Sequence, residues 1–114
     1  MTTKVDNALL NITGSVINDG NANHNLVLTD ANCYLRMTRA TANTVTVPLN
    51  ATVAFTVGDL IQGFQKGAGQ TTITPAMGVT VNGTPGLKTR AQNSPWALKY
   101  VGGDEWDLIG DLSA

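Results

Sequence analysis

The chain has 114 residues, 42% of them hydrophobic, and a formal net charge of -1. This length and composition fit one folded domain and exclude a wholly disordered chain. Only 13% of the residues are charged, and the basic ones are scattered, which argues against a nucleic-acid-binding protein. The alternative is that folding gathers a basic patch from Arg36, Arg39, Lys88 and Arg90.

The N-terminal segment, residues 1–25, differs in composition from the rest of the chain. Its stretch NDGNANHN is typical of turns, because Asn and Asp tolerate the left-handed conformation and Gly allows positive φ. We predict an N-terminal arm with one short strand at LLNITGSVI, ordered through contact with another chain. A frayed terminus is the alternative.

The first residues, MTTKVDNALLNITG, also lack the continuous apolar core of a signal peptide. No apolar run in the chain approaches the length of a membrane span. We therefore expect a protein that is made and folded in a cytoplasm, with no membrane partner.

From Leu26 onward, short runs alternate apolar and polar residues and are bounded by Gly, Pro or Asn. In NTVTVP, for example, Val45 and Val47 alternate with threonines, as in a half-buried strand. Strands are predicted, in order, at NLVLT, CYLRMTR, NTVTVP, TVAFTVG, DLIQGFQKG, QTTIT, VTVNG, GLKTRAQ, WALKYV and EWDLIGDL. We predict that residues 26–114 form an all-β domain, a single small β-sandwich or β-barrel-like domain of short antiparallel strands.

Glycines mark the predicted turns. The GAG at residues 67–69 resembles part of a phosphate-binding loop but lacks the following helix and the Lys-Ser/Thr pair, so we interpret it as a hairpin turn. Gly63 is a candidate β-bulge. Gly102 and Gly103 are predicted to close a hairpin between WALKYV and EWDLIGDL.

Histidine and cysteine, which often act in catalysis or metal binding, occur once each. His24 is the only histidine, in a Gly- and Asn-rich stretch where a general base would be poorly held, so we interpret it as a solvated loop residue. Cys33 is the only cysteine, which excludes an intramolecular disulfide and favours a small buried side chain. One Cys and one His cannot make a typical zinc site.

Carboxylates gather near the C-terminus at Asp104, Glu105, Asp107 and Asp111. Strand alternation places Glu105 and Asp107 on one face, where they could bind Ca²⁺ or a sugar hydroxyl. We favour the simpler interpretation, a solvated strand edge that charge protects from aggregation. The sequence therefore predicts no catalytic residue, no cofactor site and no metal site.

Trp96 and Trp106 have two interpretations. An exposed indole is a common platform for a sugar ring. The chain has only two Trp, two Tyr and two Phe, however, and large rings are more valuable in a core. We therefore favour core or subunit contact over a ligand platform.

A set of segments in fixed order resembles a known family. YLRMTRATANTVTVP, TVGDLIQGFQKGAGQTTITPAMGVTVNG, GLKTRAQNS and WALKYVGGDEWDLIGDLS together resemble a small β-rich structural domain in virion proteins of tailed bacteriophages. That family includes capsid decoration, head-fibre and tail-fibre proteins. The resemblance covers about residues 28 to 112 and leaves out the N-terminal segment.

The resemblance implies a virion structural protein that is not an enzyme. The chain has no shaft repeat, so we expect a capsid decoration (cement) protein that binds the major capsid protein on the outer surface of the shell. The resemblance also implies a homotrimer, located on the virion and made in the bacterial host cytoplasm. The alternative is a tail-fibre or receptor-binding module that recognises host surface carbohydrate. A third hypothesis is a small carbohydrate-active enzyme that uses Glu105 or Asp107.

Overall fold

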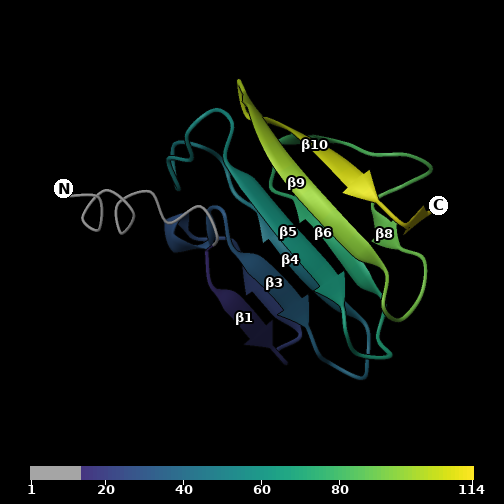
Figure 1. Ribbon diagram of the computed structural model, residues 1–114. Helices are drawn as coiled ribbons and strands as arrows, with labels where there is room; N and C mark the ends of the chain where they lie inside the picture. The colour runs from purple at the N-terminus through teal and green to yellow at the C-terminus, as the bar shows by residue number, and fades with distance from the viewer. Residues whose placement is uncertain (1–13) are drawn as a thin grey trace, which may run out of the picture.

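The computed structural model describes residues 14–114, which form two β-sheets packed against each other (Figure 1). Sheet A has the strand order β1-β3-β5-β9-β10-β7, and sheet B the order β11-β8-β6-β4-β2. The elements are β1 (Val16–Asp19), β2 (Asn23–Asn25), the 3-10 turn η1 (Leu28–Asp30), β3 (Tyr34–Met37), β4 (Asn43–Val47), β5 (Leu60–Gln65), β6 (Thr71–Pro75), β7 (Thr80–Asn82), β8 (Lys88–Thr89), β9 (Pro95–Gly102), β10 (Glu105–Gly110) and β11 (Leu112–Ser113).

The first six strands form a stack of parallel coils, in which each coil is one strand of sheet A followed by one strand of sheet B. The chain alternates between the sheets, and each strand from β1 to β4 pairs in parallel with the strand two positions later. Figure 1 shows β1, β3 and β5 side by side in the front layer, with β4 and β6 behind them. The all-β prediction is confirmed. The predicted antiparallel sandwich or barrel is wrong, because this pairing produces a solenoid-like stack of coils.

Gly69 lies in the turn that takes the chain from β5 in sheet A to β6 in sheet B. The Gly69 N–H donates to the carbonyl of Arg39 (3.2 Å), in the corresponding turn of the preceding coil. A Cβ on Gly69 would overlap the backbone of Thr41, so only glycine allows the two turns to stack this closely. The predicted hairpin at GAG is therefore a corner that carries the chain from sheet A to sheet B.

Antiparallel strands close one end of the stack. β9 and β10 form a hairpin whose first strand pairs with β5, and β8 joins β6 to β11 in the other sheet. The hairpin turn contains Gly102 and Gly103 at positive φ, as predicted from the sequence. The edge strands within residues 14–114 are β7 and β11 at this end of the stack and β1 and β2 at the other.

The core lies between the sheets and follows the alternation seen in the sequence. Val45 and Val47 are fully buried, whereas the intervening threonines of β4 are half-buried. Trp96 and Trp106 are 2% and 1% exposed, and Trp106 packs edge-to-face on Phe55 with ring centroids 5.0 Å apart. The interpretation of both tryptophans as core residues is confirmed.

A row of polar side chains is buried beside the apolar core. The Thr71 hydroxyl donates to Asn43 Oδ1 (2.6 Å), and the Thr71 N–H donates to Thr89 Oγ1 (3.0 Å). The Thr89 hydroxyl donates in turn to Gln65 Oε1. The row thus links β4, β6 and β8 of sheet B to β5 of sheet A, and its polar groups are hydrogen-bonded to one another.

Part of the segment predicted as an N-terminal arm belongs to the sheets. β1 and β2 lie within residues 1–25 and pair with β3 and β4. Residues 1–13 lie outside the described residues, and with them most of the predicted arm. Within residues 14–114, no helix is long and apolar enough to cross a membrane.

Candidate binding surface

The outer face of sheet A carries a row of residues that crosses five strands. Val16 lies opposite Tyr34, Tyr34 opposite Gln62, Gln62 opposite Ala97 and Ala97 opposite Ile109. Strand alternation points all five away from the core, and Val16 and Ile109 are 62% and 66% exposed. We call these five residues the outer row.

A second aromatic ring lies beside the outer row. Phe64 is two residues along β5 from Gln62, and its ring centroid is 6.3 Å from that of Tyr34. Arg36 lies opposite Phe64 and donates through Nη1 to Asn18 Oδ1 (3.1 Å). The two half-buried rings therefore form a rigid apolar platform with a cation at its side.

An open hollow of about 290 Å³ lies over the centre of the outer row. Its floor is low because Ala97 has a single methyl group between the longer side chains of Gln62 and Ile109. Apolar groups dominate the lining, and the Gln62 amide adds a polar group. The residues around the hollow are Tyr34, Gln62, Gly63, Pro95, Trp96, Ala97, Ile109 and Gly110.

Gly63 and Trp96 support this hollow from inside the molecule. The two residues are opposite each other on β5 and β9, and a Cβ on Gly63 would overlap the indole ring of Trp96. The indole thus fills the space where a side chain at position 63 would lie. The predicted bulge at Gly63 is wrong, because β5 keeps an unbroken register with both neighbouring strands through this residue.

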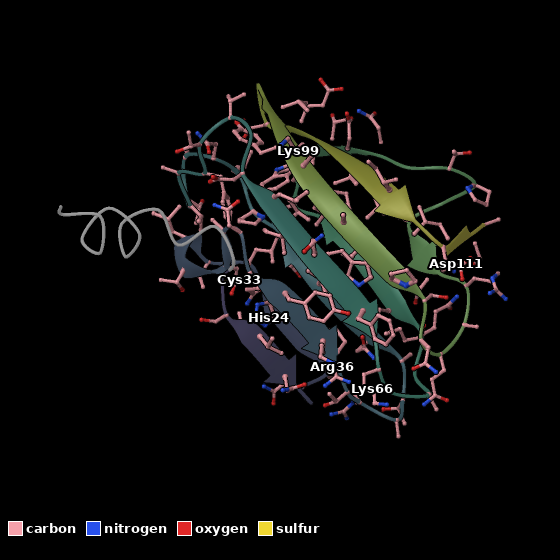
Figure 2. All side chains as sticks on the ribbon, viewed as in Figure 1. His24, Cys33, Arg36, Lys66, Lys99 and Asp111 are labelled. Atoms are coloured by element: carbon pink, nitrogen blue, oxygen red, sulfur yellow. The ribbon has the colours of Figure 1, made fainter. Side chains whose placement is uncertain are left out.

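The basic residues do not gather into the patch considered from the sequence. Arg36 lies on β3 of sheet A, and Figure 2 shows it apart from Asp111, the residue that binds Arg90. Lys88 belongs to sheet B, and Arg90 pairs with Asp111 through two hydrogen bonds of 2.8 and 2.9 Å. The pKa of the exposed Asp111 carboxyl is lowered by the hydrogen bond from Arg90 and by a second one from Ser94.

Three of the four C-terminal carboxylates, all but Asp111, are held by neutral donors. Glu105 and Asp107 point to the same side of β10, as predicted, and Asn82 Nδ2 donates to both (2.7 and 3.1 Å). Asp104 accepts the N–H of Asn50 (2.7 Å). Within the described part of the chain, no group of three or more His, Cys, Asp or Glu residues is arranged to hold a metal ion.

His24 is not a solvated loop residue, so that interpretation is wrong. It lies on β2 with 14% of its side chain exposed, with Nδ1 2.6 Å from Asp19 Oδ2 and Nε2 2.9 Å from Asp30 Oδ2. The hydrogen bond to Asp30 raises the pKa of His24 most, burial opposes this, and Asp19 adds to the rise. The turn-rich composition around His24 hid a short strand that pairs with β4.

Cys33 is buried, as expected from the sequence. Its thiol donates to the Thr29 carbonyl (3.2 Å) and accepts the N–H of Ser15 at 3.5 Å. Its role in the described structure is to fill space and tie the start of β3 to the turn before it.

Sequence reasoning singled out no member of the outer row as a binding residue. Two signals were present, because Ile109 and Phe64 are apolar residues at strand positions that alternation assigns to the polar face. The outer row as a whole could not be predicted from the sequence, because it depends on parallel pairing between strands that are distant in the chain.

The chain matches no family model and no curated protein. The expected kinship with bacteriophage virion domains therefore rests on the sequence motifs alone.

Proposed function

We propose that the protein is a non-enzymatic structural protein of a bacteriophage virion. More specifically, we propose a capsid decoration protein that binds the outer surface of the major capsid shell as a homotrimer. The observation that supports binding is the outer row with its hollow, an apolar and weakly charged face on a rigid sheet. The motif resemblance supports the virion setting.

Adhesion through this face follows from ordinary burial energetics. Each square ångström of apolar surface removed from water contributes roughly 25 cal/mol. A stable interface buries about 800 Å² on each partner, so we expect the rest of the outer face of sheet A to join the hollow in the contact. A protein that binds only the assembled shell stabilises that shell by mass action.

The test is binding of the purified protein to expanded empty shells of its phage. We expect saturating protein to raise the temperature at which the shells break. Ile109→Lys places a charge in the outer row and should weaken binding about tenfold or more, or roughly 1.4 kcal/mol. The matched control is Met77→Lys, at a residue that is 94% exposed in the turn after β6, and it should bind as the parent does.

Unchanged shell stability at full occupancy would contradict the decoration role. Equal loss of binding in both lysine variants would instead contradict the assignment of the face. Copy number per virion gives an independent check, because a shell protein is present in many copies and a tail protein in few.

A receptor-binding module for host surface carbohydrate is the second candidate. The observation that favours it is the aromatic platform of Tyr34 and Phe64 beside the Gln62 amide, since sugars stack on rings and hydrogen-bond to amides. This candidate predicts binding in a glycan screen that Tyr34→Ala abolishes. The absence of any glycan signal for the parent protein would dismiss it.

A further inference from the structure

The first coil of the stack has little apolar anchorage. β1 and β2 contain four and three residues, and within residues 14–114 each pairs with a neighbour on one side only. Leu26 is the fully buried apolar side chain of this coil, and Ile17 is partly buried. Other interactions must therefore contribute to holding the coil in place.

A cluster of three charged side chains links separate points of this coil. Asp19 ends β1, His24 is the middle residue of β2, and Asp30 ends η1. The imidazole contacts one carboxylate with each ring nitrogen, at 2.6 and 2.9 Å. The carboxylates are fixed by backbone donors, Asn21 N–H to Asp19 Oδ1 (2.8 Å) and Val27 N–H to Asp30 Oδ2 (2.9 Å).

The geometry requires a proton on each ring nitrogen. A neutral imidazole has one N–H and one lone pair, so it can donate to one carboxylate only. Its lone pair would then face an oxygen of the other carboxylate at hydrogen-bond distance, where two electron-rich atoms repel. Only the imidazolium donates to Asp19 and Asp30 together.

Among the described residues, the elements packed around His24 supply no other charge at this point. β4 places Thr44, Val45 and Thr46 opposite the three residues of β2, and β3 places Met37 opposite Asp19. The nearby cation is Arg39, which donates to a carbonyl of the turn after β1 (3.2 Å) rather than to a carboxylate. Loss of the imidazolium proton would therefore leave two mostly buried carboxylates around a neutral ring.

We propose that Asp19, His24 and Asp30 form a proton-dependent clip that fastens the first coil, and that deprotonation of His24 releases β1 and β2 while the rest of the stack stays folded. The inference does not depend on the proposed function. Release of β1 would also remove Val16 from the outer row, so the structure of the row at that end depends on pH.

The direction of the pH dependence follows from the folded-state shifts. Because the pKa of His24 is raised, its contribution is complete below its ordinary pKa of about 6.5 and is lost as the pH rises through the folded-state pKa. Burial alone would raise the pKa of Asp19, but hydrogen bonds from Asn21 and His24 lower it. The Asp19 contribution is therefore lost only as the pH falls below about 3.9 and through the lowered value.

NMR spectroscopy of the full chain tests the clip, because His24 is the only histidine and every imidazole signal belongs to it. We expect both ring nitrogens to carry protons at neutral pH, and the imidazole to titrate above its ordinary range of about 6.5. The backbone amide signals of β1 and β2 should shift or broaden with the same midpoint, while those of β5 and β6 stay unchanged.

Two variants separate the clip from general alkaline effects. His24→Gln removes the titrating group, so amides of β1 and β2 should no longer respond to pH in this range, although the α-amino group still titrates. Asp30→Asn keeps the imidazole but removes a facing charge, so the titration midpoint should move to lower pH. If His24 titrates at or below about 6.5, or if β1 and β2 do not change as it titrates, the clip is refuted.

Discussion

Thr89 shows how the molecule accommodates polar side chains inside a small core. Its hydroxyl accepts the N–H of Thr71 and donates to Gln65, and all three residues are almost completely buried. Each polar group in the row therefore depends on its neighbour for the hydrogen bond that water would otherwise supply.

Replacing Thr89 by valine should destabilise the protein by about 1–3 kcal/mol, because it leaves Gln65 Oε1 and the Thr71 N–H without a partner in the interior. The matched control is Thr74→Val on β6, where the side chain is exposed and the change should be within about 0.5 kcal/mol. Urea unfolding followed by fluorescence of the two core tryptophans measures both variants. Equal midpoints for the two would mean that the buried row contributes nothing to stability.

Individual residues also show what could be predicted from the sequence. Alternation placed Val45 and Val47 on one face of their strand, and both are buried in the core. This succeeded because side-chain facing in a strand depends only on local geometry. It failed for His24, whose carboxylate partners are five and six residues away and are brought to it by a turn and η1.

At the scale of strands, position within the sheet sets local stability. β5 lies between two hydrogen-bonded neighbours in sheet A, whereas β1 has one neighbour among the strands that the structure describes. Local opening therefore costs less free energy at β1 than at β5.

Native-state hydrogen exchange at neutral pH should show this difference. We expect the hydrogen-bonded amides of β3, whose partners include β1, to exchange faster than those of β5 and β9, by about tenfold or more for each 1.4 kcal/mol of difference in opening free energy. The amides of β6 serve as the comparison in sheet B, where β4 and β8 flank the strand. Uniform protection across all four strands would show that the stack opens only as a whole.

Pairing direction could not be predicted from these strands. The turn at residues 66–70 has a composition that suits a hairpin or a corner equally well, and the requirement for Gly69 is visible only beside the backbone of Thr41. The hairpin at Gly102 and Gly103 was predictable because both of its strands are adjacent in sequence. Parallel coils instead depend on contacts between distant segments, which local patterns do not encode.

For the molecule as a whole, the low charge sets the type of contact that it can make. The net charge is -1, and the outer row contains no ionisable group except the Tyr34 phenol. The rest of the outer face of sheet A carries Arg36 and Lys99 together with Glu105 and Asp107, so its charges balance. An interface built on this face therefore relies more on apolar burial than on net attraction between charges.

Binding to the expanded shell should accordingly be almost independent of ionic strength. We expect dissociation constants that agree within about threefold between low salt and roughly 1 M salt, where charges are screened beyond about 3 Å. Sedimentation of shells with bound protein over a salt series measures this. A steep loss of binding with salt would place the contact on the charged ends of the molecule instead.

The two ends of the stack differ in one further respect. Within residues 14–114, the stack ends after β6 in mainly antiparallel pairing, whereas β1 and β2 continue the parallel pairing of the coils up to the other end. A longer version of this architecture could therefore be made by inserting duplicated coils ahead of Val16, leaving the closing hairpin untouched. Elongation from a single end would turn a compact block into a rod whose length is set by the number of inserted repeats.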